Sequence, residues 1–404
     1  MSRAAADDRP LDAPPDTRPR VELRGHPSPH PFLKPHLLAA EPKGLTPGTL
    51  VRLGLPDGGI LGDGFFNGRS EIRVRRLTRD GVPFDRAALT GAIDRAARLR
   101  EELPGVLHAG DACRAIHAEA DGLSGLVVDR YGEVLSVELH SAGWMALLDP
   151  LLELLHARLG TRHHHVTLSE RVAAHEGVRP LRRSSEGAPE RVTVHEHGLR
   201  YRVDFGTGHK TGFFCDQRDN RFSFAGLARG DVLDACCYTG GFSLNVLQHG
   251  EPRSVTAVDL DEQAVEAARG HAKLNQHQAR LKLVHADVFD WMRQVHAAER
   301  RFDSIVLDPP KFIADRTLVE KGEAKYHDLN RLALKLLRPG GLLLTCSCSG
   351  LLPAARLVEL VRTAARKEGR DASLLAVSGA APDHPVGLEC PETEYLKALW
   401  LRVW

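Results

Sequence analysis

The chain has 404 residues, of which 42% are apolar, 26% charged and 5% aromatic. This length predicts two to three domains with a sizeable core, and the apolar fraction excludes a disordered chain. Basic and acidic residues nearly balance at 54 and 53, so the chain lacks the strong positive charge of a protein that coats nucleic acid without specificity.

Targeting and metal-binding signals are absent from the sequence. No run of about 18 apolar residues occurs, so we expect no membrane-spanning helix. The first twenty residues carry four prolines and charges of both signs, without the apolar core of a secretory signal. We therefore expect a cytoplasmic protein with a disordered tail over residues 1–20. The seven cysteines include no CxxC pair, which predicts neither a zinc site nor a disulfide framework, and we expect no metal.

The first half of the chain predicts two small domains. Residues 21–85 are rich in glycine and proline, and their strand-like runs at 49–55 and 71–77 are separated by turns, which indicates an all-β module. Residues 86–199 predict a small central α/β domain. Its expected elements are an amphipathic helix over 86–102, a hairpin around Tyr131-Gly132, a helix over 146–159 and a polar loop over 177–190.

From about residue 200 the pattern alternates between strand and helix. A helix is expected over 262–274, and the apolar strand-like runs are 231–233, 254–258, 281–284, 304–307 and 341–345. This alternation is typical of a doubly wound parallel sheet. Residues 395–404 alternate again and predict an antiparallel closing strand. We assign the α/β domain to residues 200–404.

A cofactor site is predicted where these strands end. The first strand ends at Asp234 and leads into a tight turn, Cys236-Cys237-Tyr238-Thr239-Gly240, whose N–H groups would face a ligand. Asp259 ends the second strand and suits ribose hydroxyls, and Asp287 ends the third and suits an adenine amino group. The alternative for both acids is that each caps the next helix. A dinucleotide site is disfavoured, because Cys236 and Tyr238 replace the first two glycines of G-x-G-x-x-G.

A reaction site is predicted after the fourth and fifth strands. Asp308 precedes Pro309 and Pro310, which supply no N–H donors and fix the backbone beside the cofactor. The fifth strand ends in Thr345-Cys346-Ser347-Cys348. A thiolate there is able to add to carbon 6 of a pyrimidine and so activate carbon 5 for methylation. Strand alternation puts Cys346 and Cys348 on the same side, so position alone leaves both open, as well as the alternative that they are packing residues.

These motifs resemble one family, the bacterial 23S ribosomal RNA cytosine-5 methyltransferases with an N-terminal PUA domain. The resemblance covers most of the chain after residue 20. It rests on residues 208–221, Tyr238-Thr239-Gly240-Gly241, Asp308-Pro309-Pro310-Lys311-Phe312, Ser347-Cys348-Ser349-Gly350, Asp383-His384-Pro385 and Tyr395-Leu396-Lys397.

The resemblance implies a class I (Rossmann-like) α/β methyltransferase domain that binds S-adenosylmethionine, an N-terminal all-β PUA domain and a small central α/β domain. It implies that Cys348 is the nucleophile and that Asp308 holds the target base. The cofactor residues it implies, together with those argued above, are Phe213, Gln217, Asp234, Cys236, Tyr238, Thr239, Gly240, Asp259, Asp287 and Asp308. Pro310 occupies the place where related RNA methyltransferases carry a second cysteine, so a single-cysteine mechanism is expected.

The expected partner is 23S ribosomal RNA, with no membrane, and a homodimer is kept as a candidate assembly. An arginine cluster in the β module is the predicted RNA contact: Arg69, Arg73, Arg75 and Arg76. The alternative is a solvated strand face. Two other functions remain open at this point: methylation of a guanine or adenine nitrogen, which needs no thiol, and a non-catalytic RNA-binding factor in ribosome assembly.

Overall fold

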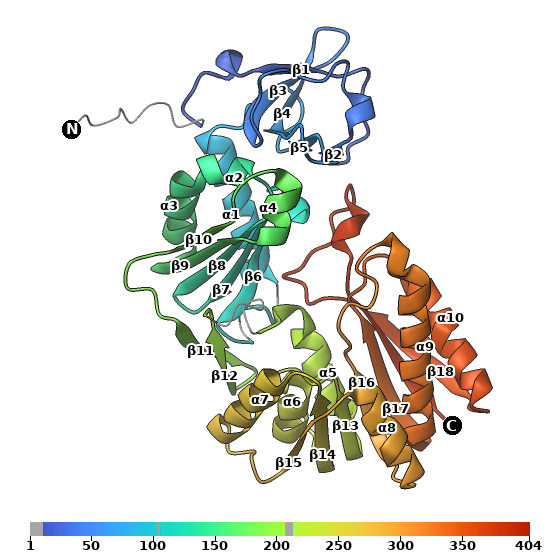
Figure 1. Ribbon diagram of the computed structural model, residues 1–404. Coiled ribbons are helices and arrows are strands. Elements are labelled where there is room, and N and C mark those ends of the chain that lie inside the picture. Colours follow the sequence, from blue (N-terminus) through green and yellow to red (C-terminus); the bar gives the residue numbers. More distant parts are fainter. Residues whose placement is uncertain (1–10, 104, 108, 207–212) are drawn as a thin grey trace. The chain divides into compact units, whose positions relative to one another are not determined.

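The computed structural model describes residues 11–103, 105–107, 109–206 and 213–404. The chain folds into two compact units (Figure 1). Unit 1 runs to Glu190 and also includes Asp383–Thr393, whereas unit 2 comprises Arg191–Pro382 and Glu394–Trp404. Residues 1–10 of the expected tail and 208–212 of the family-like segment lie outside the described residues. Within the described part of the chain, no helix has the length and apolar character needed to cross a membrane.

Unit 1 begins with a five-stranded sheet in the order β1-β3-β4-β5-β2. The strands are β1 (Arg20–Glu22), β2 (Phe32–Leu33), β3 (Thr49–Gly54), β4 (Ile60–Phe66) and β5 (Val74–Arg76), with short 3-10 turns at Pro15–Thr17 and Pro35–Leu37. Val51, Leu53 and Val74 are buried in a small core of their own. These residues form a β-sheet, as expected for 21–85, but they share one compact unit with the chain that follows up to Glu190.

The expectation of a disordered tail is wrong for residues 11–20. Leu11 is buried in the larger core of unit 1. Arg18 forms an ion pair with Asp63, and both side chains are buried. A buried charge pair of this kind fixes the chain, because separating the partners would leave an uncompensated charge inside the protein. Composition alone does not reveal the partner at Asp63.

A second sheet forms the centre of unit 1, in the order β10-β9-β8-β7-β6. Its strands are β6 (Ala112–His117), β7 (Leu126–Tyr131), β8 (Val134–Leu139), β9 (His163–Leu168) and β10 (Leu181–Ser184), and its helices are α1 (Arg86–Glu102), α2 (Gly143–Ala146), α3 (Leu148–Leu159) and α4 (Glu170–Glu176). The helix predicted over 86–102 and the hairpin around Tyr131-Gly132 are confirmed. The polar segment 177–190, for which a loop or a linker is expected, contains β10, which pairs with β9.

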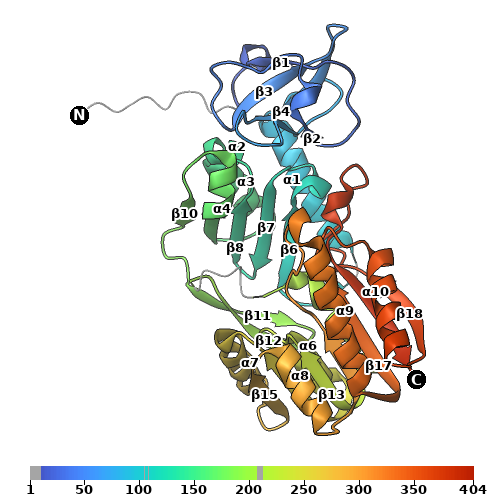
Figure 2. The same cartoon turned by 45° about the vertical axis from the view of Figure 1, so that its right-hand side comes forward.

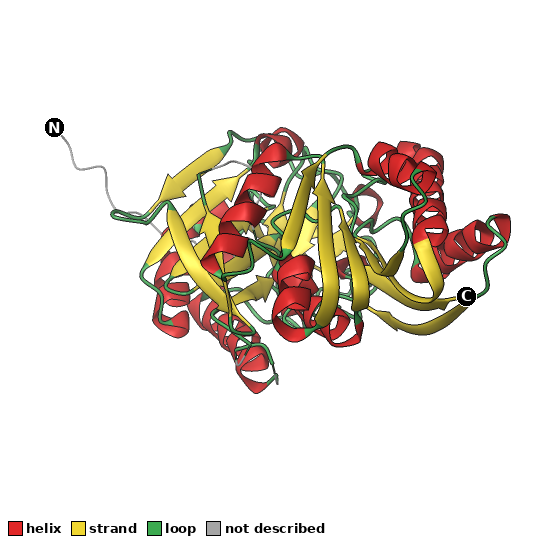
Figure 3. Cartoon of the chain, turned by 90° about the horizontal axis from the view of Figure 1, so that it is seen from below, coloured by secondary structure: helices red, strands yellow, loops and turns green. Residues whose placement is uncertain are grey.

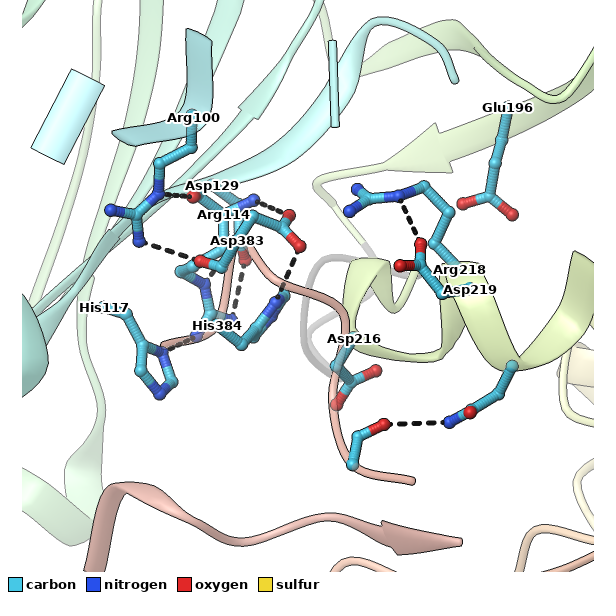
Figure 4. Close-up of polar contacts among 12 residues, drawn as sticks. Arg100, Arg114, His117, Asp129, Glu196, Asp216, Arg218, Asp219, Asp383 and His384 are labelled. Atoms are coloured by element: carbon cyan, nitrogen blue, oxygen red, sulfur yellow. Dashed lines mark hydrogen bonds and ion pairs between the residues drawn. The ribbon is translucent and has the colours of Figure 1, made fainter. Parts of the chain in front are cut away.

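Residues 383–393 return to unit 1 near the end of the chain. Asp383 accepts a hydrogen bond from the backbone N–H of Arg114 at 2.8 Å, and its carbonyl accepts one from Arg100 Nη2 at 2.8 Å (Figure 4). Arg100 also forms a two-pronged ion pair with Asp121, at 2.7 and 2.9 Å. The Asp383-His384-Pro385 motif therefore joins a buried polar network of unit 1.

Unit 2 contains a hairpin and a seven-stranded sheet in the order β15-β14-β13-β16-β17-β19-β18. The hairpin strands are β11 (Arg191–Glu196) and β12 (Leu199–Asp204), and the sheet strands are β13 (Arg229–Ala235), β14 (Glu251–Asp259), β15 (Leu281–His285), β16 (Phe302–Leu307), β17 (Leu337–Ser347), β18 (Ala372–Ser378) and β19 (Lys397–Val403). Strands β13 to β17 pair in parallel, and β19 pairs antiparallel with both β17 and β18. The predicted doubly wound sheet and antiparallel last strand are confirmed.

Helices cover both faces of this sheet (Figures 2 and 3). They are α5 (Arg218–Leu227), α6 (Gly241–His249), α7 (Glu262–Leu274), α8 (Val288–Ala297), α9 (Val319–Leu336) and α10 (Ala354–Lys367). Since both faces are covered, the central strands are apolar throughout, as in Ile305, Val306 and Leu307 of β16, all fully buried. The hairpin β11–β12 lies wholly in unit 2, although we divided the domains between 199 and 200.

Candidate active site

The turn after β13 has an unusual backbone. Cys236, Tyr238 and Gly240 adopt positive φ values of 63°, 47° and 84°. Residues with a side chain seldom occupy this region, and such strain is concentrated at ligand sites. The turn is closed by a hydrogen bond from Gly240 N to Cys237 O at 2.8 Å. Cys236 and Tyr238 therefore take the backbone conformation that glycine usually supplies in such turns.

Asp259, at the end of β14, is fixed by two backbone donors. Its Oδ2 accepts from Tyr238 N at 2.7 Å and its Oδ1 accepts from Asp261 N at 2.9 Å. The alternative that Asp259 caps α7 is wrong, because Asp261 is the capping residue. Each carboxylate oxygen of Asp259 has a second lone pair, so the geometry leaves room for two hydroxyl donors.

Asp234 lies beneath the start of α6 and is almost fully buried. Its Oδ2 accepts from Ser243 N at 3.0 Å and from Ser243 Oγ at 2.7 Å. Burial raises the pKa of Asp234 to about 6. Its Oδ1 is buried without a partner among the described residues. A buried acceptor left open in this way suits a ligand that carries a donor or a positive charge.

The four strand-end aspartates converge on Cys236. Burial raises the pKa of this thiol well above its usual value, and the carboxylates of Asp259, Asp308, Asp234 and Asp287 add to the rise. Such a concentration of negative charge fits S-adenosylmethionine, which carries a sulfonium and an ammonium group. Asp287 also caps α8 by accepting from Asp290 N at 3.1 Å, so its capping alternative is realised.

Asp308 follows β16 and faces Gln217. The amide Nε2 of Gln217 donates to Asp308 Oδ1 at 3.0 Å. Burial, and next the neighbouring carboxylate of Asp216, raise the pKa of Asp308 to about 7. A substantial fraction of Asp308 is therefore a neutral acid at physiological pH, able to donate a hydrogen bond. Asp216 was not among the predicted residues; its Oδ2 accepts from Tyr395 at 2.6 Å.

The two candidate cysteines differ in their surroundings. Cys346 is fully buried within β17, and burial raises its thiol pKa well above the usual value. Cys348 lies beyond the end of β17 and is partly exposed. Strand alternation, which would have put both thiols on one side, therefore does not extend to Cys348. A buried neutral thiol is a poor nucleophile, which counts against Cys346 in that role.

Ser349 connects the segment after Asp308 to the segment that carries Cys348. Its hydroxyl accepts from Ile313 N at 3.2 Å and contacts the Tyr326 hydroxyl at 3.0 Å. Its carbonyl accepts from Lys397 Nζ at 2.7 Å. We did not predict a role for Ser349, Tyr326 or Lys397 in the site. Their only sequence signal was the inclusion of Ser349 and Lys397 in family-like motifs.

Three further residues predicted to bind the cofactor are Phe213, Thr239 and Gly240. Phe213 is buried against Tyr201, with a ring separation of 4.8 Å, and lies beneath the Arg221 guanidinium. The neighbouring Phe214, which we had not singled out, packs on Tyr238 at 5.2 Å. Thr239 is buried, and its carbonyl accepts from His271 at 3.0 Å. Gly240 immediately precedes α6, and a side chain at this position would press against Ala268.

The four arginines of the cluster in unit 1 differ in their exposure and in their partners. Arg69 is exposed, and Arg73 pairs with the half-exposed Glu41 at 2.9 Å. Arg75 pairs with Glu119 at 3.4 Å and covers the Phe32 ring, whereas Arg76 is buried and donates to the Pro29 carbonyl. Burial lowers the pKa of Arg76 to about 10.

One other group in unit 1 has the composition of a metal site: His30, Cys390 and Glu392 lie within 4.8 Å of one another. His30 Nδ1 accepts from Phe32 N at 3.0 Å, so the neutral ring carries its proton on Nε2. That nitrogen lies 3.1 Å from Glu392 Oε2. A hydrogen bond therefore already occupies the nitrogen that a metal would need, and we assign no metal here.

The parallel sheet, the strained turn and the aspartates at the strand ends define a class I S-adenosylmethionine-dependent methyltransferase. A family profile of S-adenosylmethionine-dependent methyltransferases matches residues 151–375. The crystal structure of SMU.776 complexed with SAH shares the fold, with a TM-score of 0.80 at 20% identity, and covers 95% of this chain and 99% of that chain.

Curated relatives make the family more specific. Ribosomal RNA large subunit methyltransferase I of Alteromonas mediterranea is 36% identical over 351 residues, covering 86% of this chain and 88% of that protein. The protein of the same name from Aeromonas hydrophila is 37% identical over 366 residues, covering 88% and 90%. The chain belongs to this family of methyltransferases, as the motif resemblance predicted.

Proposed function

We propose that the protein methylates carbon 5 of a cytosine in 23S ribosomal RNA through a covalent adduct with Cys348. The relatives named above are ribosomal RNA large subunit methyltransferases, which supports RNA of the large subunit as the substrate. The observation that carries the choice of carbon 5 is the partly exposed Cys348 next to the segment of Asp308, whereas Cys346 is buried. Methylation of a ring nitrogen requires no thiol at this place.

In the proposed reaction, Cys348 forms the covalent bond to the base and Asp308 supplies a proton to it. The Cys348 thiolate bonds to carbon 6, and the electrons of the C5–C6 double bond move through C4 to N3. N3 takes a proton from neutral Asp308, and carbon 5 gains the electron density to receive the methyl group that bound S-adenosylmethionine supplies. The C5 proton then passes to solvent water, its C–H electrons re-form the C5–C6 double bond and expel the Cys348 thiolate, and N3 returns its proton to Asp308.

Asp308 is suited to this role because its pKa, raised to about 7, keeps part of it protonated. An ionised carboxylate would repel the electrons that collect at N3. Asp259, Asp234 and Asp287 are proposed to hold the cofactor, with the strained turn at Cys236, Tyr238, Thr239 and Gly240 and the segment at Phe213 and Gln217 forming the rest of its pocket.

The N-terminal β module is proposed as a PUA-type RNA-binding domain that uses Arg69, Arg73, Arg75 and Arg76. Of these, Arg69 and Arg73 are the more open to a phosphate. Because the target base must leave its stack to reach Cys348, we expect recognition of loops or partly unfolded RNA in the cytoplasm. A non-catalytic assembly role would not require a partly exposed thiol beside an acidic cofactor pocket.

The test is a covalent trap. In vitro transcribed 23S RNA that contains 5-fluorocytidine should form a stable adduct with the wild-type protein, because fluorine blocks loss of the C5 substituent. Cys348→Ala should form no adduct and no product, whereas Cys346→Ala should retain most activity. An adduct that persists in Cys348→Ala and disappears in Cys346→Ala would transfer the role to Cys346. Full activity of both variants would instead support nitrogen methylation.

The modified nucleotide is found by bisulfite mapping of ribosomal RNA from a strain that lacks the protein. One protected cytosine should become convertible in that strain and become protected again when the wild-type protein is restored. Restoration by Cys348→Ala would contradict the cysteine mechanism.

A further inference from the structure

A line of buried and partly buried hydrogen bonds ends on Asp308. It begins at Trp400 of β19, whose Nε1 donates to Ser378 Oγ at 2.8 Å. Ser378, at the end of β18, donates to Asn220 Oδ1 of α5 at 2.8 Å. Asn220 Nδ2 donates to Gln217 Oε1 at 2.7 Å, and Gln217 Nε2 donates to Asp308 Oδ1 at 3.0 Å. All five residues belong to unit 2.

The chemistry of the groups fixes the direction of this line. An indole N–H can only donate, so the Ser378 hydroxyl uses a lone pair for Trp400 and directs its own proton to Asn220. Asn220 must then present its oxygen to Ser378 and its NH2 group to Gln217. The NH2 group of Asn220 also donates to the Gly379 carbonyl at 3.0 Å, which holds the amide in the same orientation.

The orientation of Gln217 follows from that of Asn220. Its oxygen must accept from Asn220, so its NH2 group faces Asp308. Gln217 and Asn220 are buried, so bulk water does not readily replace either partner. If the Gln217 amide were reversed, two NH2 groups would meet at one end of the line and its oxygen would face Asp308.

We propose that Ser378, Asn220 and Gln217 are positioning residues that keep the acidic proton of Asp308 on Oδ2, where N3 of the target base receives it. An N–H donor at Oδ1 makes that oxygen the acceptor of the neutral carboxyl group, which leaves the proton on the other oxygen. This inference rests on the proposed function, in which Asp308 donates to N3. A reversed Gln217 would attract the proton to Oδ1 and withhold it from the base.

Disruption of the line should also change the ionisation of Asp308. The Gln217 hydrogen bond lowers the pKa of Asp308 against the larger effect of burial, so its loss should raise that pKa. The other titratable groups that face Asp308 are Asp216 before α5, Arg221 of α5, Asp234 of β13, Cys236 of the turn after β13 and Cys346 of β17. None of these groups is altered by a change at Ser378.

The experiment compares Ser378→Ala with Ser373→Ala, a matched change at an exposed serine of the same strand. Methyl transfer is measured in single turnovers from pH 6 to 9 with saturating cofactor and 23S RNA from a strain that lacks the protein. Ser378→Ala should lower the maximal rate about tenfold, the effect of one typical hydrogen bond. The alkaline fall of the rate should move to higher pH, and cofactor affinity by calorimetry should not change.

Two further variants separate positioning from packing. Ser378→Thr keeps the hydroxyl and should restore the wild-type rate and pH profile. Asn220→Asp removes the NH2 donor that orients Gln217 and should shift the alkaline fall in the same direction as Ser378→Ala. A Ser378→Ala profile equal to that of Ser373→Ala, or a Ser378→Thr profile equal to that of Ser378→Ala, would overturn the inference.

The 5-fluorocytidine adduct tests the proposed function, and the pH profile of Ser378→Ala tests the positioning role. If wild-type protein forms the 5-fluorocytidine adduct while the pH profile of Ser378→Ala is unchanged, only the positioning role is wrong. If wild-type protein forms no adduct and the product carries its methyl group on a ring nitrogen, the proposed function is wrong, and the assignment of the Asp308 proton is overturned with it.

Discussion

Lys397 Nζ lies 2.7 Å from the carbonyl oxygen of Ser349, the residue that follows Cys348. A second carbonyl, that of Tyr395, lies 3.0 Å from the same nitrogen. Lys397 pairs in register with Ser347 across the antiparallel strands β17 and β19. A buried ammonium group is thereby held at the carbonyl of the residue after the proposed nucleophile, while the Lys397 backbone pairs with the residue before it.

The charge of Lys397 should assist Cys348. Burial lowers the pKa of Lys397, while Glu394 and then Cys348 act in the opposite direction. The same attraction favours the thiolate form of Cys348. Lys397→Met should therefore slow alkylation of Cys348 by iodoacetamide about tenfold at pH 7, equivalent to about one pKa unit. Peptide mass spectrometry measures the rate for Cys348 alone.

The control for this prediction is Lys282→Met, which removes an exposed lysine from β15. Cys348 of this variant should be alkylated by iodoacetamide at the wild-type rate. An equal rate in Lys397→Met and Lys282→Met would limit Lys397 to holding the two carbonyls.

Cofactor binding should depend on Asp259. The two backbone bonds to Asp259 fix its carboxylate at the end of β14, so its remaining lone pairs are held in one orientation. Asp259→Ala should weaken S-adenosylmethionine binding by about 1–3 kcal/mol, the range for a lost bond to a charged group. Calorimetry measures the affinity, with Asp290→Ala of α8 as the control. Unchanged affinity in Asp259→Ala would remove this residue from the site.

RNA binding should depend on the open arginines of unit 1. Replacing Arg69 and Arg73 with alanine should lower RNA affinity and reduce the slope of log affinity against log salt by about one unit for each lost phosphate contact. Arg76→Ala should instead lower the stability of unit 1, because the buried Arg76 bonds to the Pro29 carbonyl. Filter binding at several salt concentrations tests both. An unchanged slope in the double variant would leave Arg69 and Arg73 as a solvated surface.

The sequence predicted well the helices and strands whose apolar residues recur at a regular spacing. The helix over 262–274 and the ends of the parallel strands follow from apolar periodicity, which local burial imposes. The positions of Asp234, Asp259 and Asp308 follow from it, because the carboxyl ends of parallel strands share one edge of the sheet.

The sequence did not reveal contacts between distant residues. Gln217 and Asp308 are 91 positions apart, and Ser378 and Asn220 are 158 apart. The segment that begins at Asp383 likewise belongs to unit 1, although in the sequence it follows all the parallel strands of unit 2. Cys346 and Cys348 looked equivalent because alternation was extended past Ser347, where the strand in fact ends.

His117 of β6 should make the stability of unit 1 dependent on pH. Its Nδ1 lies 3.1 Å from Arg114 Nη1, and its ring lies 5.3 Å from that of His384 (Figure 4). Burial and the charge of Arg114 lower the pKa of His117 to about 2. The folded protein therefore keeps His117 neutral, with Nδ1 accepting from Arg114 Nη1, whereas the unfolded chain takes up a proton near pH 6.5.

The sign follows from proton uptake by the unfolded state. A depressed folded pKa contributes stability that is present above about pH 6.5 and is lost as the pH falls toward the folded value, at about 1.4 kcal/mol per pH unit. His117→Gln keeps an acceptor for Arg114 but does not titrate. Between pH 7 and 5, wild-type protein should lose about 2 kcal/mol more stability than His117→Gln. Urea unfolding, followed for unit 1 by hydrogen exchange of β6 peptides at matched pH, measures this difference. Equal losses in the two proteins would mean that His117 becomes protonated without unfolding unit 1.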